Sequence, residues 1–448
     1  MKKICLHIMI AAIFITGPMA AQTTSKTLTI DDAVNLALQN NIEIKQSTMD
    51  LELLGTKNKY SWNSVSPSIS ASGGFNGQTP LESGSETSFS YSLGASLRLS
   101  LTPTLRTAMK EALLNYESGK ATLETTKRRI ELEVRKTFYS LIYFNDNIEN
   151  QQRNLETAKQ TYESNKAKYS QGRLAELQLL NSQYNYEKKI PEIESLKRTY
   201  QSNIENFKLL LGLDLDEEIT LQGKLDDAFN VHFDESTLET SLASIEENAS
   251  IKNLKQQIAL TQNKLQSAKL ASYAPSISFS LSESTTGSSK ETKNPFSGAV
   301  IKDSWEPSST LSYGVSVNLP LDGFFPWSNG KLGVQGIQTA EETLKKLQMN
   351  LEQTRTQTRL TVKNSYNSIL QNITQLELLE KSEELTQKAY EMSKNAYNMG
   401  STDLISLQQA EDNLYSARYN VQNQKYTILT SILTLEDTLG LPFGTLGK

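Results

Sequence analysis

The chain has 448 residues, of which 37% are hydrophobic and 21% are charged, with 45 basic residues against 50 acidic ones. The low apolar share argues against one large compact core, while the small net charge and periodic apolar residues argue against disorder. The acidic balance disfavours nucleic-acid binding, because phosphates select a basic surface. Two histidines and one cysteine are too few for most zinc sites, histidine-based triads or thiol redox pairs. We therefore do not expect an enzyme, a metal site or a cofactor.

The first residues have the layout of a secretory signal peptide. Lys2 and Lys3 precede an apolar run from Ile4 to Ile15, and small residues follow up to Ala21. The run is too short to cross a bilayer as a helix. We therefore predict that residues 1–21 are a removable signal peptide and that the exported chain is free of cysteine and of a lipid anchor.

The chain contains an internal repeat. Matching residues stand 228 positions apart, from Leu132 and Leu360 to the Leu-Gly-Leu triplets at 211–213 and 439–441. One constant spacing means that the two copies have elements of equal length. We predict a first repeat at residues 22–213, an acidic linker or equatorial segment at 214–237, and a second repeat at 238–448.

Each repeat is predicted to run helix, strand, strand, very long helix, tight turn, very long helix. Thr29 and Asp32 have the spacing of a capping box, which places the start of the first helix there. The long helix from Leu105 to Tyr169 would measure about 100 Å at 1.5 Å per residue. Gly172 and Gly400 stand in two Tyr-x-x-Gly turns, where glycine can end one helix and let the chain reverse.

Apolar residues recur every seven positions along these helices, which is typical of coiled-coil packing. The stripe lies at Val134, Leu141, Ile148, Leu155, Tyr162 and Tyr169, and in the second repeat at Val362, Ile369, Leu376, Tyr390 and Tyr397, with Glu383 as a break. The returning helices carry it from Leu179 to Phe207 and from Leu407 to Leu435.

Four segments alternate strictly between apolar and small polar residues. The longest are Phe89–Leu101 and Leu311–Leu321, and the shorter ones are Ile69–Phe75 and Ile277–Leu281. Such alternation gives a strand one apolar and one polar face. The helices use their apolar stripes on each other, so we interpret the strands as transmembrane, with the apolar face on lipid.

Four strands cannot close a barrel, and open edges are not tolerated in lipid. Several copies must therefore contribute strands: two would give eight strands and a filled barrel, three would give twelve and room for a channel. Aromatic residues near the strand ends suit an interfacial girdle: Trp305, Phe324, Phe325 and Trp327.

The sequence resembles the TolC-type outer-membrane efflux proteins, also called outer membrane factors. The resemblance rests on the segment Leu28–Val34 with Leu36–Asn41, on the duplication, on the two Tyr-x-x-Gly turns and on Leu414–Ala417. It implies an α+β membrane protein in which a homotrimer forms a twelve-stranded barrel continuous with a long helical coiled-coil barrel. It also implies an exit duct in the outer membrane of a diderm bacterium, with helices extending into the periplasm.

The resemblance further implies partners and sites. The duct would serve a tripartite efflux or type I secretion system, with an inner-membrane pump of the RND or ABC type and a periplasmic adaptor. The adaptor would dock on the tips: Tyr169, Gly172, Arg173, Leu174, Tyr397, Gly400, Ser401 and Thr402. The family closes its mouth with aspartate rings just past the glycine turns, but here those places hold Gln178, Ser406 and Gln409, with Glu176 and Asp403 nearby. We therefore expect a closed mouth with a constriction at these five residues.

Two other classes remain as alternatives at this point. A non-channel coiled-coil protein of the periplasm, such as an adaptor, would also carry helical hairpins, but its soluble fold would leave the four alternating strands unexplained. A hydrolase would need a catalytic pair such as Glu246 and Glu247, which on a solvated helix face is ordinary charge decoration. The sequence does not identify the cargo.

Overall fold

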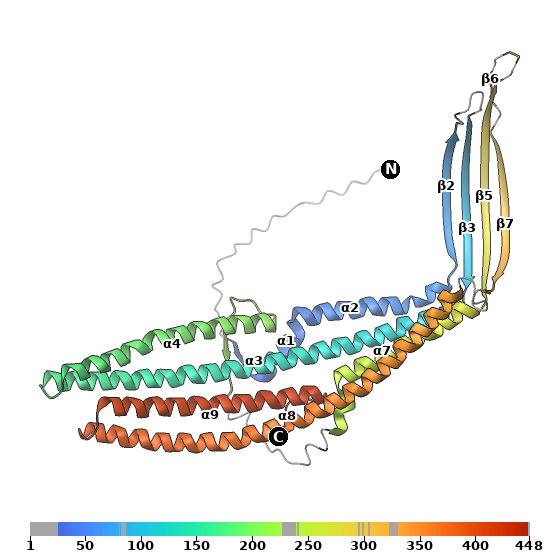
Figure 1. Cartoon of the computed structure of the whole chain (residues 1–448). Helices are drawn as coiled ribbons and strands as arrows, with labels where there is room; N and C mark the ends of the chain where they lie inside the picture. The colour runs from blue at the N-terminus through green and yellow to red at the C-terminus, as the bar shows by residue number, and fades with distance from the viewer. Residues whose placement is uncertain are drawn as a thin grey trace, which may run out of the picture. The chain divides into compact units, whose positions relative to one another are not determined.

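The structure, a computed structural model, describes residues 26–79, 81, 87–225, 239, 242–293, 296–297, 300–302, 305–321 and 330–446 (Figure 1). The chain divides into two compact units. The first, here called the helical unit, comprises Met1–Asn41, Glu133–Phe229 and Leu378–Tyr426, and the second, the sheet unit, comprises Ile42–Leu132, Asn230–Glu377 and Thr427–Lys448. The predicted signal peptide, residues 226–237 of the predicted linker, and Phe324, Phe325 and Trp327 lie outside the described residues.

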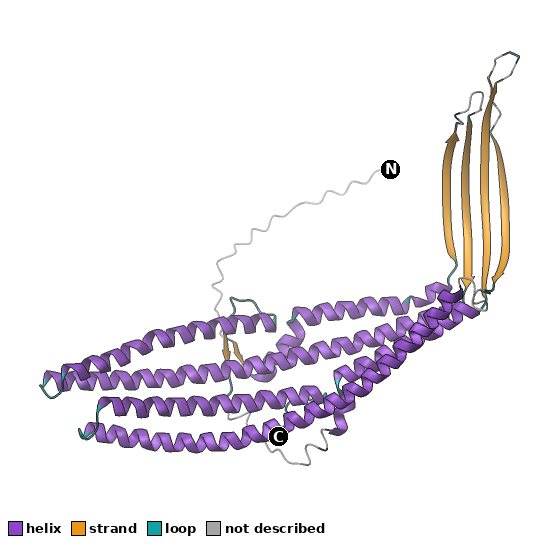
Figure 2. Cartoon of the chain, viewed as in Figure 1, coloured by secondary structure: helices purple, strands orange, loops and turns teal. Residues whose placement is uncertain are grey.

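The predicted order of elements is confirmed in both halves (Figure 2). The first half contains β1 (Lys26–Leu28), α1 (Ile30–Asn40), α2 (Ile42–Lys59), the 3-10 helix η1 (Ser61–Val65), β2 (Ser68–Gln78), β3 (Ser88–Leu101), α3 (Leu105–Ser170), α4 (Glu176–Leu211) and β4 (Ile219–Leu221). The second half contains the 3-10 helix η2 (Ser244–Glu247), α7 (Ala249–Tyr273), β5 (Ser276–Lys293), β6 (Val300–Lys302), β7 (Glu306–Asn318), α8 (Gly330–Asn398) and α9 (Leu404–Leu439).

The capping box at the start of α1 is present. The backbone N–H of Asp32 donates to Thr29 Oγ1 at 3.3 Å, and the N–H of Thr29 donates to Asp32 Oδ2 at 3.2 Å. Two donors that the first helical turn leaves without partners are thereby satisfied. Sequence reasoning missed the neighbouring parallel pair, in which β1 and β4 align Leu28 with Leu221.

The two repeats end in the same joint. After α4, Asn41 Nδ2 donates to the carbonyl of Leu210 at 2.9 Å, and after α9, Asn248 Nδ2 donates to the carbonyl of Thr438 at 2.7 Å. Leu210 and Thr438 are 228 residues apart, so the repeat spacing is carried into a hydrogen bond between distant elements. In each repeat, an asparagine directly before a helix thus binds the end of the returning helix: Asn41 before α2 binds α4, and Asn248 before α7 binds α9.

The four long strands form one antiparallel sheet in the order β2, β3, β5, β7, with β6 pairing only with the end of β5. Its register aligns the apolar residues across all strands: Ile69 faces Leu97, which faces Leu281, which faces Tyr313. The other face is a ladder of hydroxyls, with Ser70 and Ser96 Oγ atoms 2.8 Å apart and Ser278 and Ser316 Oγ atoms 2.7 Å apart.

Among the described residues, none covers the apolar face of the sheet. Tyr313 is 84% exposed, Ile69 79% and Val315 66%, although residues of these types are usually buried. An exposed apolar face of this size is typical of a surface that meets lipid or a partner. Trp305 lies against Phe75 and Tyr91, with ring centroids 6.1 and 5.6 Å away. The aromatic girdle stays a prediction.

The last predicted strand is shorter than expected. The alternation suggested a strand up to Leu321, but β7 ends at Asn318, and Leu319 and Leu321 lie beyond it. Pro320 is the physical reason, because it has no backbone N–H to donate to a sheet and restricts the residue before it. Alternation alone does not reveal where a strand ends.

The heptad stripes are deeply buried at the end away from the turns, where Val134, Leu141, Val362 and Ile369 are at most 1% exposed. Close to the turns the stripes differ, since Tyr169 on α3 is 41% exposed whereas Leu407 on α9 is 6% exposed. Within the described part of the chain, no helix is both long and apolar enough to span a membrane.

Candidate functional site at the helical tips

Both helical hairpins reverse through the same backbone structure. Gly172 and Gly400 have φ of +68° and +73°, the left-handed region that glycine enters without steric cost. The N–H of Arg173 donates to the carbonyl of Lys168 at 2.9 Å, and the N–H of Ser401 donates to the carbonyl of Ala396 at 2.9 Å. These are Schellman turns, which satisfy the last carbonyls of α3 and α8. The predicted role of the two glycines as helix ends is confirmed.

The tip residues are largely exposed. Tyr169, Gly172, Arg173, Gly400 and Ser401 are exposed, and a Cβ added to either glycine would meet no atom within 4 Å. Leu174, Tyr397 and Thr402 are half-buried. The predicted docking residues thus lie at two open turns.

Tyr397 joins the two hairpins close to the turns. Its hydroxyl donates to Asn165 Oδ1 on α3 at 2.6 Å, and Lys168 Nζ lies 4.9 Å from the centre of its ring. Asn165 is fully buried. Sequence reasoning placed Tyr397 in the apolar stripe and missed this bond; the available signal was an asparagine three residues after Tyr162, at the second core position of the heptad.

Two of the five predicted constriction residues share a groove. Ser406 and Gln409, on α9, line a groove of about 460 Å³ together with Ile405 and with Thr386 and Ala389 of α8. Gln409 Nε2 donates to Asn413 Oδ1, also in the groove, at 3.0 Å. Gln178 is half-buried on α4 and is not among the residues that line the groove.

The two predicted carboxylates differ in their local role. Asp403 precedes α9, and its Oδ1 accepts a hydrogen bond from the backbone N–H of Ser406 at 2.8 Å. Hydrogen bonds from Ser406, first from its side chain and then from its backbone, lower the pKa of Asp403. Glu176 is the first residue of α4, which begins after Ala175 without a side-chain cap. Asp403 therefore caps the start of α9.

Two charged residues are buried in the helical unit, Glu411 on α9 and Lys189 on α4, and sequence reasoning singled out neither. Glu411 is 3% exposed, and its Oε1 is buried without a hydrogen-bond partner. Burial raises the pKa of Glu411 to about 7. Lys189 of α4 is also buried, and its Nζ lies 3.7 Å from Asp412 Oδ1. The signal was present: Glu411 stands four residues after Leu407, where a heptad places its next core residue.

Comparisons with known proteins agree with this architecture. The profile of the family described as "Outer membrane efflux protein" matches residues 33–213 and 242–441. No curated protein sequence matches the chain. Among solved structures, CusC superposes with a TM-score of 0.74 at 15% identity, covering 92% of this chain and 92% of that chain.

Two further channels have the same fold. The CmeC outer membrane channel of Campylobacter jejuni gives a TM-score of 0.72 at 18% identity, covering 92% of this chain and 85% of that chain. The open-state MtrE outer membrane channel of Neisseria gonorrhoeae gives 0.70 at 17% identity, covering 92% and 89%.

The family match spans both repeats. The matched residues contain the four strands with an exposed apolar face and the two helical hairpins. Channels of this family form trimers in efflux systems and perform no enzymatic reaction. The chain belongs to the outer membrane efflux protein family: it is a bacterial outer-membrane efflux channel with a periplasmic helical extension.

Proposed function

We propose that this chain forms a homotrimer that serves as the passive exit duct of a tripartite efflux or type I secretion system. Three copies of the four-stranded sheet give a twelve-stranded barrel, wide enough for a channel. An inner-membrane pump of the RND or ABC type delivers cargo, and a periplasmic adaptor opens the duct by contact with the helical tips. The observation that carries the proposal is the pair of equivalent exposed turns at Gly172 and Gly400.

Two exposed apolar stripes on the helical unit support assembly into a ring. On α8 and at the first residue after it, exposed residues recur every seven positions at Leu378, Leu385, Met392 and Met399. On α4, Leu177, Leu180 and Tyr184 are 53–70% exposed. Because the two stripes lie on different helices, joining one copy's α8 to the next copy's α4 gives a head-to-tail contact, which can close into a ring.

The assembly is tested by a charge within the α8 stripe. Leu385→Glu should abolish the trimer, because the carboxylate would be buried without a partner at the contact between copies. Lys394→Glu is the control, since Lys394 is exposed on the same helix and stands nine positions after Leu385, which places it on the opposite face. Native mass spectrometry of the detergent-extracted protein reads the outcome, and a stable Leu385→Glu trimer would refute the proposed contact.

Docking at the tips is tested with a cysteine, because Cys5 is the only cysteine of the chain and lies in the predicted signal peptide. Ser401→Cys, on the exposed second turn, should form a cross-link to the periplasmic adaptor in cells when a short thiol-to-amine reagent is added. Ser195→Cys, exposed midway along α4, should not. Equal labelling at both positions would contradict docking at the tips.

The five residues Glu176, Gln178, Asp403, Ser406 and Gln409 are proposed to form the constriction of the closed mouth. In a trimer each would appear three times around the axis. Ser406, Gln409 and Gln178 are neutral, so the constriction would be held by hydrogen bonds between copies rather than by charge. Single-channel conductance of Gln409→Ala should exceed that of the unmodified protein if the mouth closes there.

A further inference from the structure

Glu283 places a carboxylate on the apolar face of the sheet. The strand predicted from the alternation ends at Leu281, whereas β5 continues to Lys293 and puts Glu283 on the same face as Leu281. Its neighbours in the register are Ala95 of β3 and Leu311 of β7, and its side chain is exposed. In a membrane barrel this face meets lipid, where an ionisable side chain is costly unless a partner compensates it. A partner for this carboxylate is therefore expected.

The hydrogen bonds around Glu283 leave only acceptors open to a ligand. Thr285 Oγ1 donates to Glu283 Oε1 at 2.8 Å, so Thr285 must accept in its 2.8 Å contact with Ser309 Oγ. Ser309 therefore donates to Thr285, and Thr285 donates to Glu283. A hydroxyl has one proton to donate and an ionised carboxylate has none. The lone pairs that this chain of bonds leaves can be satisfied only by a ligand that donates hydrogen bonds.

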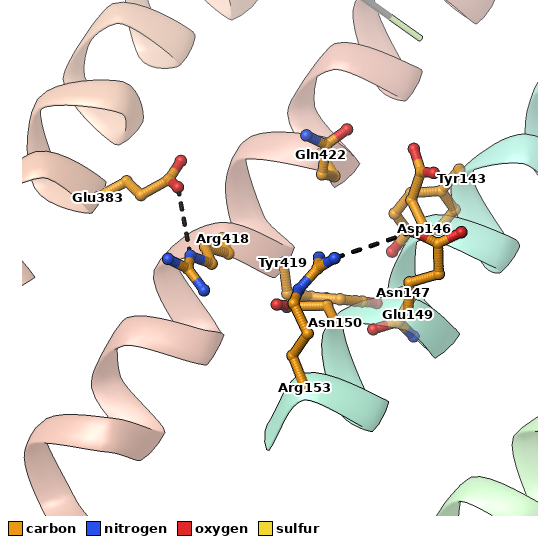
Figure 3. A pocket seen from close by; sticks show the side chains of 10 residues that line it. All are labelled: Tyr143, Asp146, Asn147, Glu149, Asn150, Arg153, Glu383, Arg418, Tyr419 and Gln422. Carbon is orange, nitrogen blue, oxygen red and sulfur yellow. Dashed lines mark ion pairs between the residues drawn. The ribbon is translucent and has the colours of Figure 1, made fainter. Parts of the chain in front are cut away.

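No basic residue shares this part of the apolar face with Glu283. The face is formed by every second residue, and Glu283 is the only charged one on it within Ile69–Gly77, Phe89–Leu101, Ile277–Ser289 and Pro307–Val317. By contrast, in the pocket of the helical unit shown in Figure 3, Glu383 Oε1 lies 3.6 Å from Arg418 Nε. The charge of Glu283 is not compensated in this way, so its ligand should carry a positive charge and no anionic group.

An apolar groove adjoins Glu283 on the same face. Its volume is about 490 Å³, and it is lined by Leu97, Phe279, Leu281, Tyr313 and Val315, together with Ser280 and Gly314. Leu281 stands two residues before Glu283, so the groove and the carboxylate are about 7 Å apart along the strand. Because β5 begins directly after α7 and the helices extend into the periplasm, the groove lies on the periplasmic side of Glu283. An alkyl chain in the groove would therefore have its head group on the outer side, as a lipid of the outer leaflet has.

We propose that this site binds a membrane amphiphile with a primary ammonium head group, which lies on Glu283 while its alkyl chain fills the groove. The ammonium supplies both the positive charge and the N–H donors that the carboxylate lacks. The inference rests on the proposed barrel only in that this face must meet lipid, and each copy of the chain holds one site. The fold alone does not dictate the site: β2 repeats β5 at the 208-residue offset of Pro67 and Pro275, and Phe75 stands where β5 has Glu283.

Native mass spectrometry of the intact protein in a non-ionic detergent tests the site with dodecylamine, and dodecanol is the neutral counterpart of equal chain length. We expect dodecylamine to bind saturably at one molecule per chain, and dodecanol about tenfold more weakly. Glu283→Gln should weaken dodecylamine binding about tenfold, the usual effect of losing a hydrogen bond between charged groups, and leave dodecanol unchanged. Glu306→Gln is the control, because Glu306 is an exposed carboxylate that faces Ser288 on the other side of the sheet. It should change neither.

A second variant tests the groove separately from the carboxylate. Val315→Trp fills the groove with a side chain that lipid tolerates, so it should weaken the binding of both amphiphiles. Equal binding of dodecylamine and dodecanol would mean that the groove takes alkyl chains whatever their head group, and tighter binding of dodecyl maltoside would mean a sugar head group; either would overturn the ammonium assignment. Absence of dodecylamine binding would overturn the site itself. The same spectra give the mass of the assembly, so a failure of the proposed trimer is distinguished from a failure of the site.

Discussion

Glu411 should make the packing of the helical unit sensitive to pH. Its carboxyl is almost completely buried on α9, where burial raises its pKa from 4.5 to about 7, with Asp412 adding to the rise. Lys189 of α4 and Lys394 of α8 act in the opposite direction and do not offset burial. The packed state therefore favours the protonated carboxyl, whereas the unfolded chain ionises it near pH 4.5.

The sign and size of the effect follow from this difference. As pH rises from about 4.5 to about 7, the packed helices lose stability because the unfolded chain releases a proton that the packed state retains. Above about pH 7 the loss is complete, and 2.5 pKa units correspond to about 3 kcal/mol at 1.36 kcal/mol per unit. Acidification should thus tighten the contact of the two hairpins.

Glu411→Gln removes the titration and is the decisive variant. Its stability relative to the unmodified protein should be higher at pH 8 than at pH 5 by up to about 3 kcal/mol. Hydrogen exchange of the amides around residues 407–415, corrected for intrinsic rates, reads the local stability at each pH. Glu384→Gln is the control, because Glu384 is exposed, pairs with Lys381 and Lys388, and has its pKa lowered to about 2 by those hydrogen bonds. The same pH slope in the unmodified protein and in Glu411→Gln would refute the reasoning.

Two further predictions concern stability and assembly. Gly400→Ala should destabilise the trimer by only about 1–2 kcal/mol, the cost of a left-handed backbone for a residue whose Cβ lies in open space. Gly440→Ala should cost roughly 1–3 kcal/mol more, because its Cβ would lie 2.8 Å from the carbonyl oxygen of Glu247. Thermal unfolding ranks the two variants. Leu97→Asp should impair assembly far more than Ser96→Asp, since a charge on the lipid face costs up to about 2–4 kcal/mol; equal yields of heat-modifiable trimer on gels would contradict the assignment of the two sheet faces.

Much of the fold could be predicted from the sequence because its elements are long and regular. The helix predicted from Leu105 to Tyr169 runs from Leu105 to Ser170, since no proline or buried charge interrupts its heptads. The capping box at Thr29 and the turn glycines are local features, so they are visible in the sequence. The pair of β1 and β4 was not, because three-residue strands that are 193 positions apart leave no periodic signal.

The candidate site was harder to predict because it depends on contacts between helices. The sequence places Ser406 and Gln409 just past a turn, but the groove they share with Thr386 and Ala389 arises only from the packing of α8 on α9. Glu411 and Asn165 were overlooked because the apolar stripe was followed at one residue per heptad. Reading both core positions of each heptad would have found these polar residues inside the helical unit.

Asp403 can act both as a helix cap and as a charge at the mouth, and one substitution separates the two roles. Asparagine caps a helix about as well as aspartate, so Asp403→Asn should keep the bond to the N–H of Ser406 while it removes the charge. The repeat-related residue is Ala175, and the first turn carries its carboxylate one position later, at Glu176. We expect modest cation selectivity in single-channel recordings of the unmodified protein. Asp403→Asn should have lower cation selectivity and unchanged thermal stability. Gln409→Asp should be strongly blocked by multivalent cations. Unchanged selectivity in Asp403→Asn would reduce Asp403 to its cap, and tight block of the unmodified protein would mean that another carboxylate ring lines the mouth.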